Sequence, residues 1–148
     1  MDSARHSQGF TLIELLVVVI IIAVLAAIAM PVYARQRSNA KDAAVREGVH
    51  HIAAGIATWA ADHNDVFPQE GQVTSLTWNG RATEFSAYVQ PWPKNAYSGQ
   101  PMRGSYGVGD YTYHTTPRPP VSGSYVGITI TDFTLQGHLS NNRSFTVR

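Results

Sequence analysis

The chain has 148 residues, a formal net charge of +1 and no cysteine. A charge balance this close to neutral gives no electrostatic reason to expect a nucleic-acid surface or an acidic tail. The lack of cysteine excludes a disulfide framework, a thiolate metal cluster and a thiol nucleophile within this sequence.

An apolar run extends from Leu12 to Met30, and Glu14 is its only charged residue. About twenty mostly apolar residues are enough for a helix to cross the hydrocarbon core of a bilayer, so the run predicts a transmembrane helix. A secretory signal cleaved among the alanines of residues 23–29 is the alternative. That alternative leaves the carboxylate unexplained, because an acidic group inside such a core costs about 2 to 3 kcal/mol and usually has a partner or a function.

Residues 9–16 read GFTLIELL and follow a short polar leader, residues 1–9. The leader and this octet together resemble the start of bacterial type IV prepilins and type II secretion pseudopilins. The resemblance implies that a prepilin peptidase/methyltransferase cuts between Gly9 and Phe10 and N-methylates Phe10. It also implies a single-pass precursor in the inner (cytoplasmic) membrane, an assembly platform with ATPase-driven machinery, and an extracellular or periplasmic helical filament of identical subunits.

Glu14 lies one helical turn from Phe10, on roughly the same face of the predicted helix. In the family, the matching glutamate is thought to attract the terminal amine of a neighbouring subunit during assembly, and we expect this role for Glu14. A paired carboxylate in a low-dielectric setting can set orientation and register even where its net stabilisation is small. The alternative is a glutamate that extends to the lipid headgroups from near the end of the span.

Basic residues flank the apolar run unevenly. Arg5 precedes it, whereas three basic residues follow it: Arg35, Arg37 and Lys41. The positive-inside rule alone predicts that the C-terminal part stays in the cytoplasm. The resemblance implies the opposite orientation, which we adopt, and the basic residues then face lipid headgroups or neighbouring subunits.

Helical periodicity continues beyond the apolar run to about Asp62. Apolar residues at steps of four and three predict a stripe that packs on a C-terminal domain; they are Val45, Val49, Ile52, Ile56 and Trp59. Charged and polar residues lie mostly off this stripe, and we expect them on a solvated or subunit-facing side; they are Lys41, Asp42, Arg46, Glu47 and His50.

Three helix-breaking residues fall inside this helix. Pro31 predicts a kink or local unwinding near residues 27–30, because it removes a backbone hydrogen bond and clashes with the preceding turn. A membrane-boundary proline without a mechanical role is the alternative. Gly48 and Gly55 share a helix face and permit close packing, although an accidental placement explains them equally well.

Turn-forming residues at 62–65 end the helical pattern. Short runs typical of β-strands follow, with candidates at Tyr106 to Thr116, Ser124 to Ile130 and Ser144 to Val147, and with a strand or helix between Trp78 and Val89. Phe133 and Leu135 have the opposite parity to the strand at 124–130, so we expect a bulge near residues 131–132. The expected fold is α+β, a pilin fold in which one long N-terminal helix packs on a small antiparallel sheet of three or four strands.

These patterns divide the chain into four parts: a cleaved leader (1–9), a transmembrane and filament-core helix (10–33), an amphipathic helical continuation (34–64) and a β-rich globular domain (65–148). Residues 88–102 also resemble the proline-rich loop of major type II secretion pseudopilins. Some of those proteins bind calcium through a later aspartate-rich loop. Residues 137–142 contain no carboxylate here, so we expect no calcium site of that type.

Chemistry of other kinds has little support in the sequence. His50 and His51 are adjacent on a helix and point in different directions, which disfavours joint metal binding. No catalytic constellation can be argued from spacing, so we expect no enzyme and no cofactor. The tryptophans and tyrosines are expected in the core and in subunit interfaces.

The function that accounts for most of these residues is that of a structural filament subunit, and we favour the major pilin of a type IV pilus-like filament. A pseudopilin of a type II secretion or DNA-uptake system is the alternative within the family. A membrane-tethered extracytoplasmic binding domain is the alternative from a different class.

Overall fold

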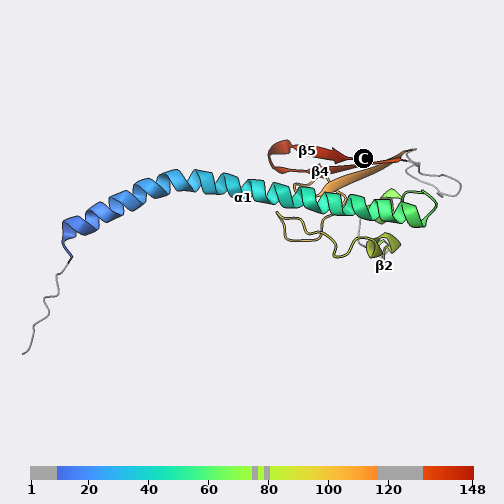
Figure 1. Cartoon of the computed structure of the whole chain (residues 1–148), viewed down its shortest axis with the longest axis horizontal. Helices are drawn as coiled ribbons and strands as arrows, with labels where there is room; N and C mark the ends of the chain where they lie inside the picture. Colours follow the sequence, from blue (N-terminus) through green and yellow to red (C-terminus); the bar gives the residue numbers. More distant parts are fainter. Residues whose placement is uncertain (1–9, 75–76, 79–80, 117–131) are drawn as a thin grey trace, which may run out of the picture. The chain divides into compact units, whose positions relative to one another are not determined.

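The computed structural model describes residues 10–74, 77–78, 81–116 and 132–148. Its first element is the α-helix α1 (Leu12–Asp62), which is 51 residues long (Figure 1). The chain divides into two compact units, Met1–Arg37 and Ser38–Arg148, and α1 contributes to both. We refer to them as unit 1 and unit 2 and describe each by itself.

Unit 2 combines the second part of α1 with a three-stranded antiparallel sheet, as expected for an α+β fold. The sheet has the order β3-β4-β5, formed by β3 (Tyr111–Thr116), β4 (Asp132–His138) and β5 (Ser144–Val147). Its register places Leu135 opposite both Tyr113 and Val147. Smaller elements complete the unit: α2 (Glu70–Val73), the antiparallel pair β1 (Thr77–Trp78) and β2 (Arg81–Ala82), and the 3₁₀ helices η1 (Glu84–Ala87) and η2 (Ser140–Asn142).

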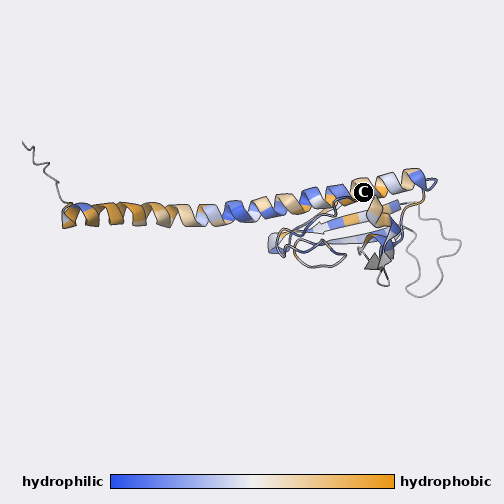
Figure 2. Ribbon diagram, turned by 90° about the horizontal axis from the view of Figure 1, so that it is seen from below, coloured by the Kyte–Doolittle hydropathy of each residue, from blue (hydrophilic) through white to orange (hydrophobic). Residues whose placement is uncertain are grey.

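The core of unit 2 lies between α1 and the sheet. All five residues of the predicted stripe are buried, with exposed fractions of 0 to 5%. They form one cluster with side chains from α2, η1, the loop at 88–102 and the sheet, among them Val73, Phe85, Val89, Met102, Tyr111, Tyr113 and Leu135. Figure 2 shows the corresponding change along α1, from continuously hydrophobic to mixed.

Polar groups close the end of α1 and link it to the sheet. Asn64 and Asp65 adopt the left-handed conformation that ends a helix, which Asn and Asp tolerate better than most residues. The hydroxyl of Tyr113 donates a hydrogen bond to the carbonyl oxygen of Pro68 (2.8 Å), and the hydroxyl of Tyr111 donates one to that of Val73. The two tyrosines therefore fix the segment after α1 against β3.

Several predicted elements differ in detail from the structure. The segment between Trp78 and Val89 contains the end of β1, the whole of β2 and the 3₁₀ helix η1, and the strand expected from Tyr106 begins only at Tyr111. Phe133 and Leu135 are buried, and β5 spans the predicted Ser144 to Val147. The strand expected at Ser124 to Ile130, and most of the expected bulge, lie outside the described residues.

Candidate functional site

The first turn of α1 is closed by a reciprocal pair of hydrogen bonds between Thr11 and Glu14. The Thr11 amide and hydroxyl both donate to Oε2 of Glu14, at 2.9 and 2.7 Å, and the Glu14 amide donates to Oγ1 of Thr11 at 3.3 Å. This is a capping box, in which the residue before the helix and the third helical residue satisfy free amides at the helix start. A carboxylate is also favoured here by the helix dipole.

The capping box was not anticipated, although the sequence contains its signal. The pattern T-x-x-E before an apolar run at residues 11–14 predicts such a cap. The expectation for Glu14 concerns only the membrane and a neighbouring amine. The Glu14 carboxylate has a hydrogen-bond partner, Thr11, within the same chain. Among the described residues, both hydrogen bonds that this carboxylate accepts are made by Oε2. Oε1 is thus available to a further donor.

The surroundings of Glu14 are apolar. An open groove of about 330 Å³ is lined by Phe10, Ile13, Glu14, Val17 and Val18. Phe10 is 77% exposed, and the large apolar side chains along the following turns are exposed as well. An apolar surface of this extent requires lipid or another protein to cover it. In this groove the Glu14 carboxylate can orient a cationic group of the lipid or protein that covers it.

The helix containing this groove is long enough and apolar enough to cross a membrane, by length and composition. It continues without interruption through residues 27–30 and Pro31. The predicted local unwinding is therefore absent from the structure of the single chain, and a kink at Pro31 stays a prediction. Gly9, the expected cleavage position, lies outside the described residues.

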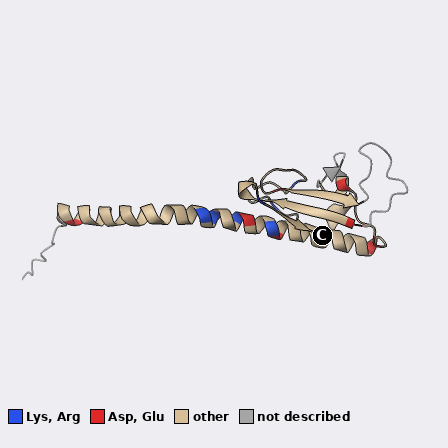
Figure 3. Cartoon of the chain, turned by 90° about the horizontal axis from the view of Figure 1, so that it is seen from above, with Lys and Arg blue, Asp and Glu red and all other residues tan. Residues whose placement is uncertain are grey.

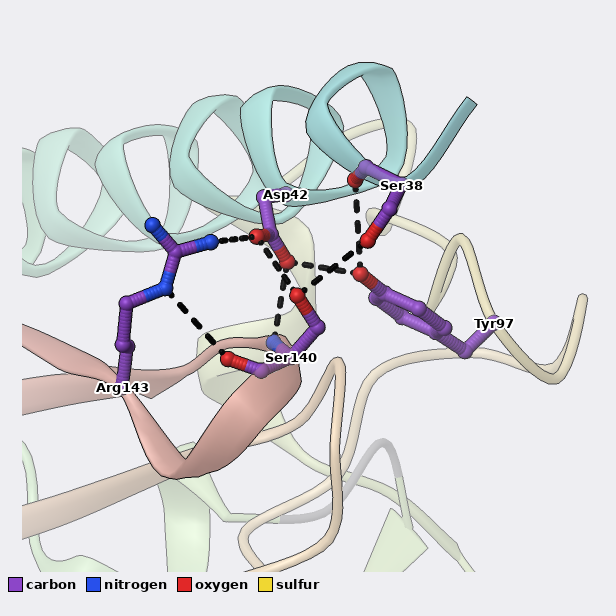
Figure 4. Close-up of polar contacts among 5 residues, drawn as sticks. All are labelled: Ser38, Asp42, Tyr97, Ser140 and Arg143. Carbon is purple, nitrogen blue, oxygen red and sulfur yellow. Dashed lines mark hydrogen bonds and ion pairs between the residues drawn. The ribbon is translucent and has the colours of Figure 1, made fainter. Parts of the chain in front are cut away.

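A second polar site lies in unit 2, around the carboxylate of Asp42 (Figure 4). Asp42 is only 1% exposed and accepts four hydrogen bonds: from the Tyr97 hydroxyl (2.6 Å), the Ser140 amide (3.0 Å), the Ser140 hydroxyl (2.9 Å) and Nη2 of Arg143 (2.7 Å). The Ser38 hydroxyl lies 3.3 Å from that of Ser140. We call these five residues the Asp42 clasp, because they join α1 to residues near both 97 and 140.

The clasp corrects the expectation that Asp42 faces solvent or another subunit. Burial alone raises the pKa of its carboxyl. The hydrogen bonds from Ser140 and Tyr97 and the positive charge of Arg143 outweigh burial, so the pKa is lowered below its ordinary value. A buried carboxylate requires such compensation. No sequence signal identifies the partners, because they lie 55 to 101 positions away.

The two helix glycines allow a loop, rather than another helix, to approach α1. A Cβ at Gly55 would lie 2.3 Å from Cγ2 of Val89, and one at Gly48 would lie 2.6 Å from Sδ of Met102. Both contacts are shorter than van der Waals separation. The face shared by Gly48 and Gly55 therefore receives the loop at 88–102, which also positions Tyr97 for the clasp.

The histidines expected at the surface take different positions. His50 is exposed, with its ring centroid 6.0 Å from that of Phe145. His51 is half-buried and lines an open groove with Glu47 and Lys94. Within the described residues, three or more potential ligands (His, Cys, Asp or Glu) nowhere gather to hold a metal ion.

Comparisons with known proteins point to one group. A family model described as the prokaryotic N-terminal methylation motif matches residues 4–30. The chain is 26% identical over 125 residues to the type IV wide pilus major component PilA4 of Thermus thermophilus, covering 84% of this chain and 93% of that protein. No solved structure gives a significant match.

Proposed function

The chain belongs to the type IV pilin family, and we propose that it is the major structural subunit of a type IV pilus-like filament. The relative named above is described as a major pilus component. The observation that carries the proposal is the exposed apolar surface of unit 1, which begins at the methylation motif and contains one carboxylate. Lipid covers this surface in the precursor, and copies of the chain cover it in the filament.

In this proposal a prepilin peptidase/methyltransferase cleaves after Gly9 and methylates Phe10. The new amine of Phe10 precedes the capping box directly, and Glu14 is already oriented at the helix start by Thr11. The amine of a neighbouring subunit can then bind the carboxylate from the groove. A cationic partner lowers the free-energy cost of holding a carboxylate in apolar surroundings. Because this pairing forms at only one alignment of the two helices, it sets their register.

The processing step is tested by mass spectrometry of the mature protein. The expected N-terminal residue is N-methylated Phe10. An intact leader, or cleavage among the alanines at residues 23–29, would contradict the processing step.

The assembly role of Glu14 is tested with two substitutions. Glu14→Ala removes the charge and the cap, whereas Glu14→Gln removes the charge but keeps an oxygen that can accept from Thr11. Both variants should insert into the membrane and yield roughly tenfold fewer filaments or worse, since a lost buried charge pair is worth several kcal/mol. Wild-type filament yield from Glu14→Gln would contradict the pairing with an amine, and a loss confined to Glu14→Ala would assign the role of Glu14 to the cap.

A pseudopilin of a secretion or DNA-uptake system would share the same processing and the same packing of α1. Electron microscopy of surface filaments, with peptide identification, separates the two roles. Surface filaments built mainly from this chain support the pilus. Filaments that appear only on overproduction favour the pseudopilin.

A further inference from the structure

The basic positions of α1 in unit 2 lie at the start of its helical segment, where acidic positions are interleaved with them, and acidic positions lie towards its far end (Figure 3). The basic end is formed by the first turns of α1 in this unit and by the neighbouring loops. Lys41 lies over the ring of Tyr97 (4.9 Å), Arg46 lies near that of Phe145 (5.9 Å), and Lys94 shares a groove with Gly48. We define the basic end by four side chains: Lys41, Arg46, Lys94 and Arg143.

The acidic end lies where α1 finishes. Asp62 is the last residue of α1, and Glu84 begins η1, which packs on the same end of α1 because the ring centroids of Phe85 and Tyr88 lie 6.1 and 5.1 Å from that of Trp59. Asp132 begins β4 next to Phe133, whose ring centroid lies 5.1 Å from that of Phe67, just beyond α1. We define the acidic end by five side chains: Asp62, Asp65, Glu70, Glu84 and Asp132.

Carboxylates also lie at the basic end and lower its net charge. Asp42 is paired with Arg143, and Asp110 accepts hydrogen bonds from three neutral donors, which are the Asn95 amide, the Arg103 backbone amide and the Ser105 hydroxyl, and keeps its negative charge. Glu47 is exposed there and subtracts one charge. With Asp42, Glu47 and Asp110 subtracted from its four cations, the basic end has a net charge of about +1, whereas the acidic end has five carboxylates, of which Glu70 lies 3.5 Å from Nδ1 of His114. The two ends therefore keep opposite net signs.

The acidic end is also hollowed. An open pocket of about 500 Å³ adjoins Asp62 and is lined by aromatic and polar side chains. Trp59 and His63 stack in it with centroids 3.9 Å apart, and Phe67 forms part of its wall. Such a surface suits a Lys or Arg side chain, which can place its methylene groups on aromatic rings and its charge near a carboxylate.

We propose that the acidic end of unit 2 docks on the basic end of unit 2 in a second copy of this chain. The contact is head-to-tail, because the two surfaces differ, and head-to-tail contacts build open filaments. From Arg46 to Asp62 the helix advances about 24 Å, so two copies that make this contact with parallel helices are displaced along α1 by at least roughly that distance. The inference rests on the proposed filament and identifies which surfaces of the globular unit meet in it.

The test reverses charge at each end of the full-length chain in cells that assemble the filament. One variant combines Arg46→Glu with Lys94→Glu, another combines Asp62→Lys with Glu84→Lys, and a third contains all four changes. All four residues are exposed. Arg148→Glu is the control, since Arg148 is exposed and belongs to neither end. Sheared filaments are quantified against protein retained in the membrane, and each purified variant is checked for an unchanged Tm.

Each two-residue reversal should reduce sheared filaments about fivefold or more, and the four-residue variant should recover most of the loss, because opposite charges face each other again. If a reversal lowers the Tm, the milder pair Lys94→Glu and Glu84→Lys replaces it. Failure of the combined variant to recover, with wild-type filaments present, overturns the end-to-end contact alone. A defect confined to Arg46→Glu with Lys94→Glu, together with weaker binding to anionic vesicles, assigns the basic end to lipid. Absence of wild-type filaments overturns the proposed function as well.

Discussion

Replacing Asp42 by alanine is expected to destabilise unit 2 severely. The change removes the acceptor for four hydrogen bonds of 2.6 to 3.0 Å. The Tyr97 hydroxyl and the Ser140 amide, which are both partly buried, then lose the carboxylate, and the Tyr97 hydroxyl keeps only the long bond to the Ser38 carbonyl oxygen (3.5 Å). Arg143 suffers less, because its side chain is 54% exposed and can be hydrated.

The magnitude follows from these contacts. Removing one member of a buried ion pair costs about 3 to 5 kcal/mol, mostly because it leaves groups unpaired. Hydrogen bonds to charged groups contribute about 1.5 to 3 kcal/mol each, and rehydration of Arg143 returns part of that loss. We therefore expect the free energy of unfolding to fall by about 3 to 5 kcal/mol. A typical domain has only about 5 to 15 kcal/mol in total.

Urea unfolding followed by tryptophan fluorescence measures this change in the full-length protein held in detergent. The three tryptophans, Trp59, Trp78 and Trp92, all follow residue 38, so their signal reports unit 2. With a slope of about 2 kcal/mol per molar urea, the midpoint should fall by roughly 1.5 to 2.5 M.

Two matched variants divide the effect. Tyr97→Phe removes one donor and should cost about 1 to 2 kcal/mol, whereas Arg143→Ala, at an exposed side chain, should cost about 1 kcal/mol or less. An Asp42→Ala midpoint within about 0.5 M of wild type, at an unchanged slope, would refute the reasoning.

Two further predictions concern acid and the helix glycines. The pKa of Asp42 is lowered in the folded state, so the stabilisation that its carboxylate contributes is complete above the pKa of the unfolded state, near 3.8, and is lost as the pH falls through the pKa of the folded state. The free energy of unfolding, measured between about pH 5 and 2, should therefore fall more steeply for wild type than for Asp42→Asn. Gly55→Ala should destabilise unit 2 by about 1 to 3 kcal/mol, because the new methyl group meets Val89 at 2.3 Å. Gly48→Ala should cost less, because the flexible end of Met102 can move; equal Tm losses in the two variants would contradict this ranking.

Local patterns in the sequence were sufficient for the helix and its buried stripe. The spacing from Val45 to Trp59 placed five side chains on one face, and all five are buried. The alternation in residues 144–147 likewise marked a strand at its observed position. These features depend on periodicity, which a single segment contains.

Contacts between distant segments were not predictable in this way. Asp42 looks like an exposed helix residue because its spacing departs from the stripe, and its burial depends on Tyr97, Ser140 and Arg143. Pro31 predicts a kink or local unwinding; the helix is continuous at this position, and the kink stays a prediction. The cap between Thr11 and Glu14, by contrast, is a local feature that the pattern T-x-x-E is sufficient to predict.

The Asp42 clasp also determines how the C-terminal segment is kept attached to unit 2. Ser140 and Arg143 connect β4 and β5 to α1 through hydrogen bonds and one ion pair. No disulfide can form within this sequence, which lacks cysteine. The attachment of β4 and β5 to α1 therefore does not depend on the redox state of the surroundings or on thiol-disulfide oxidoreductases. It forms when the chain folds and needs no later oxidation step. Strong acid, rather than a reducing agent, is the condition that releases it.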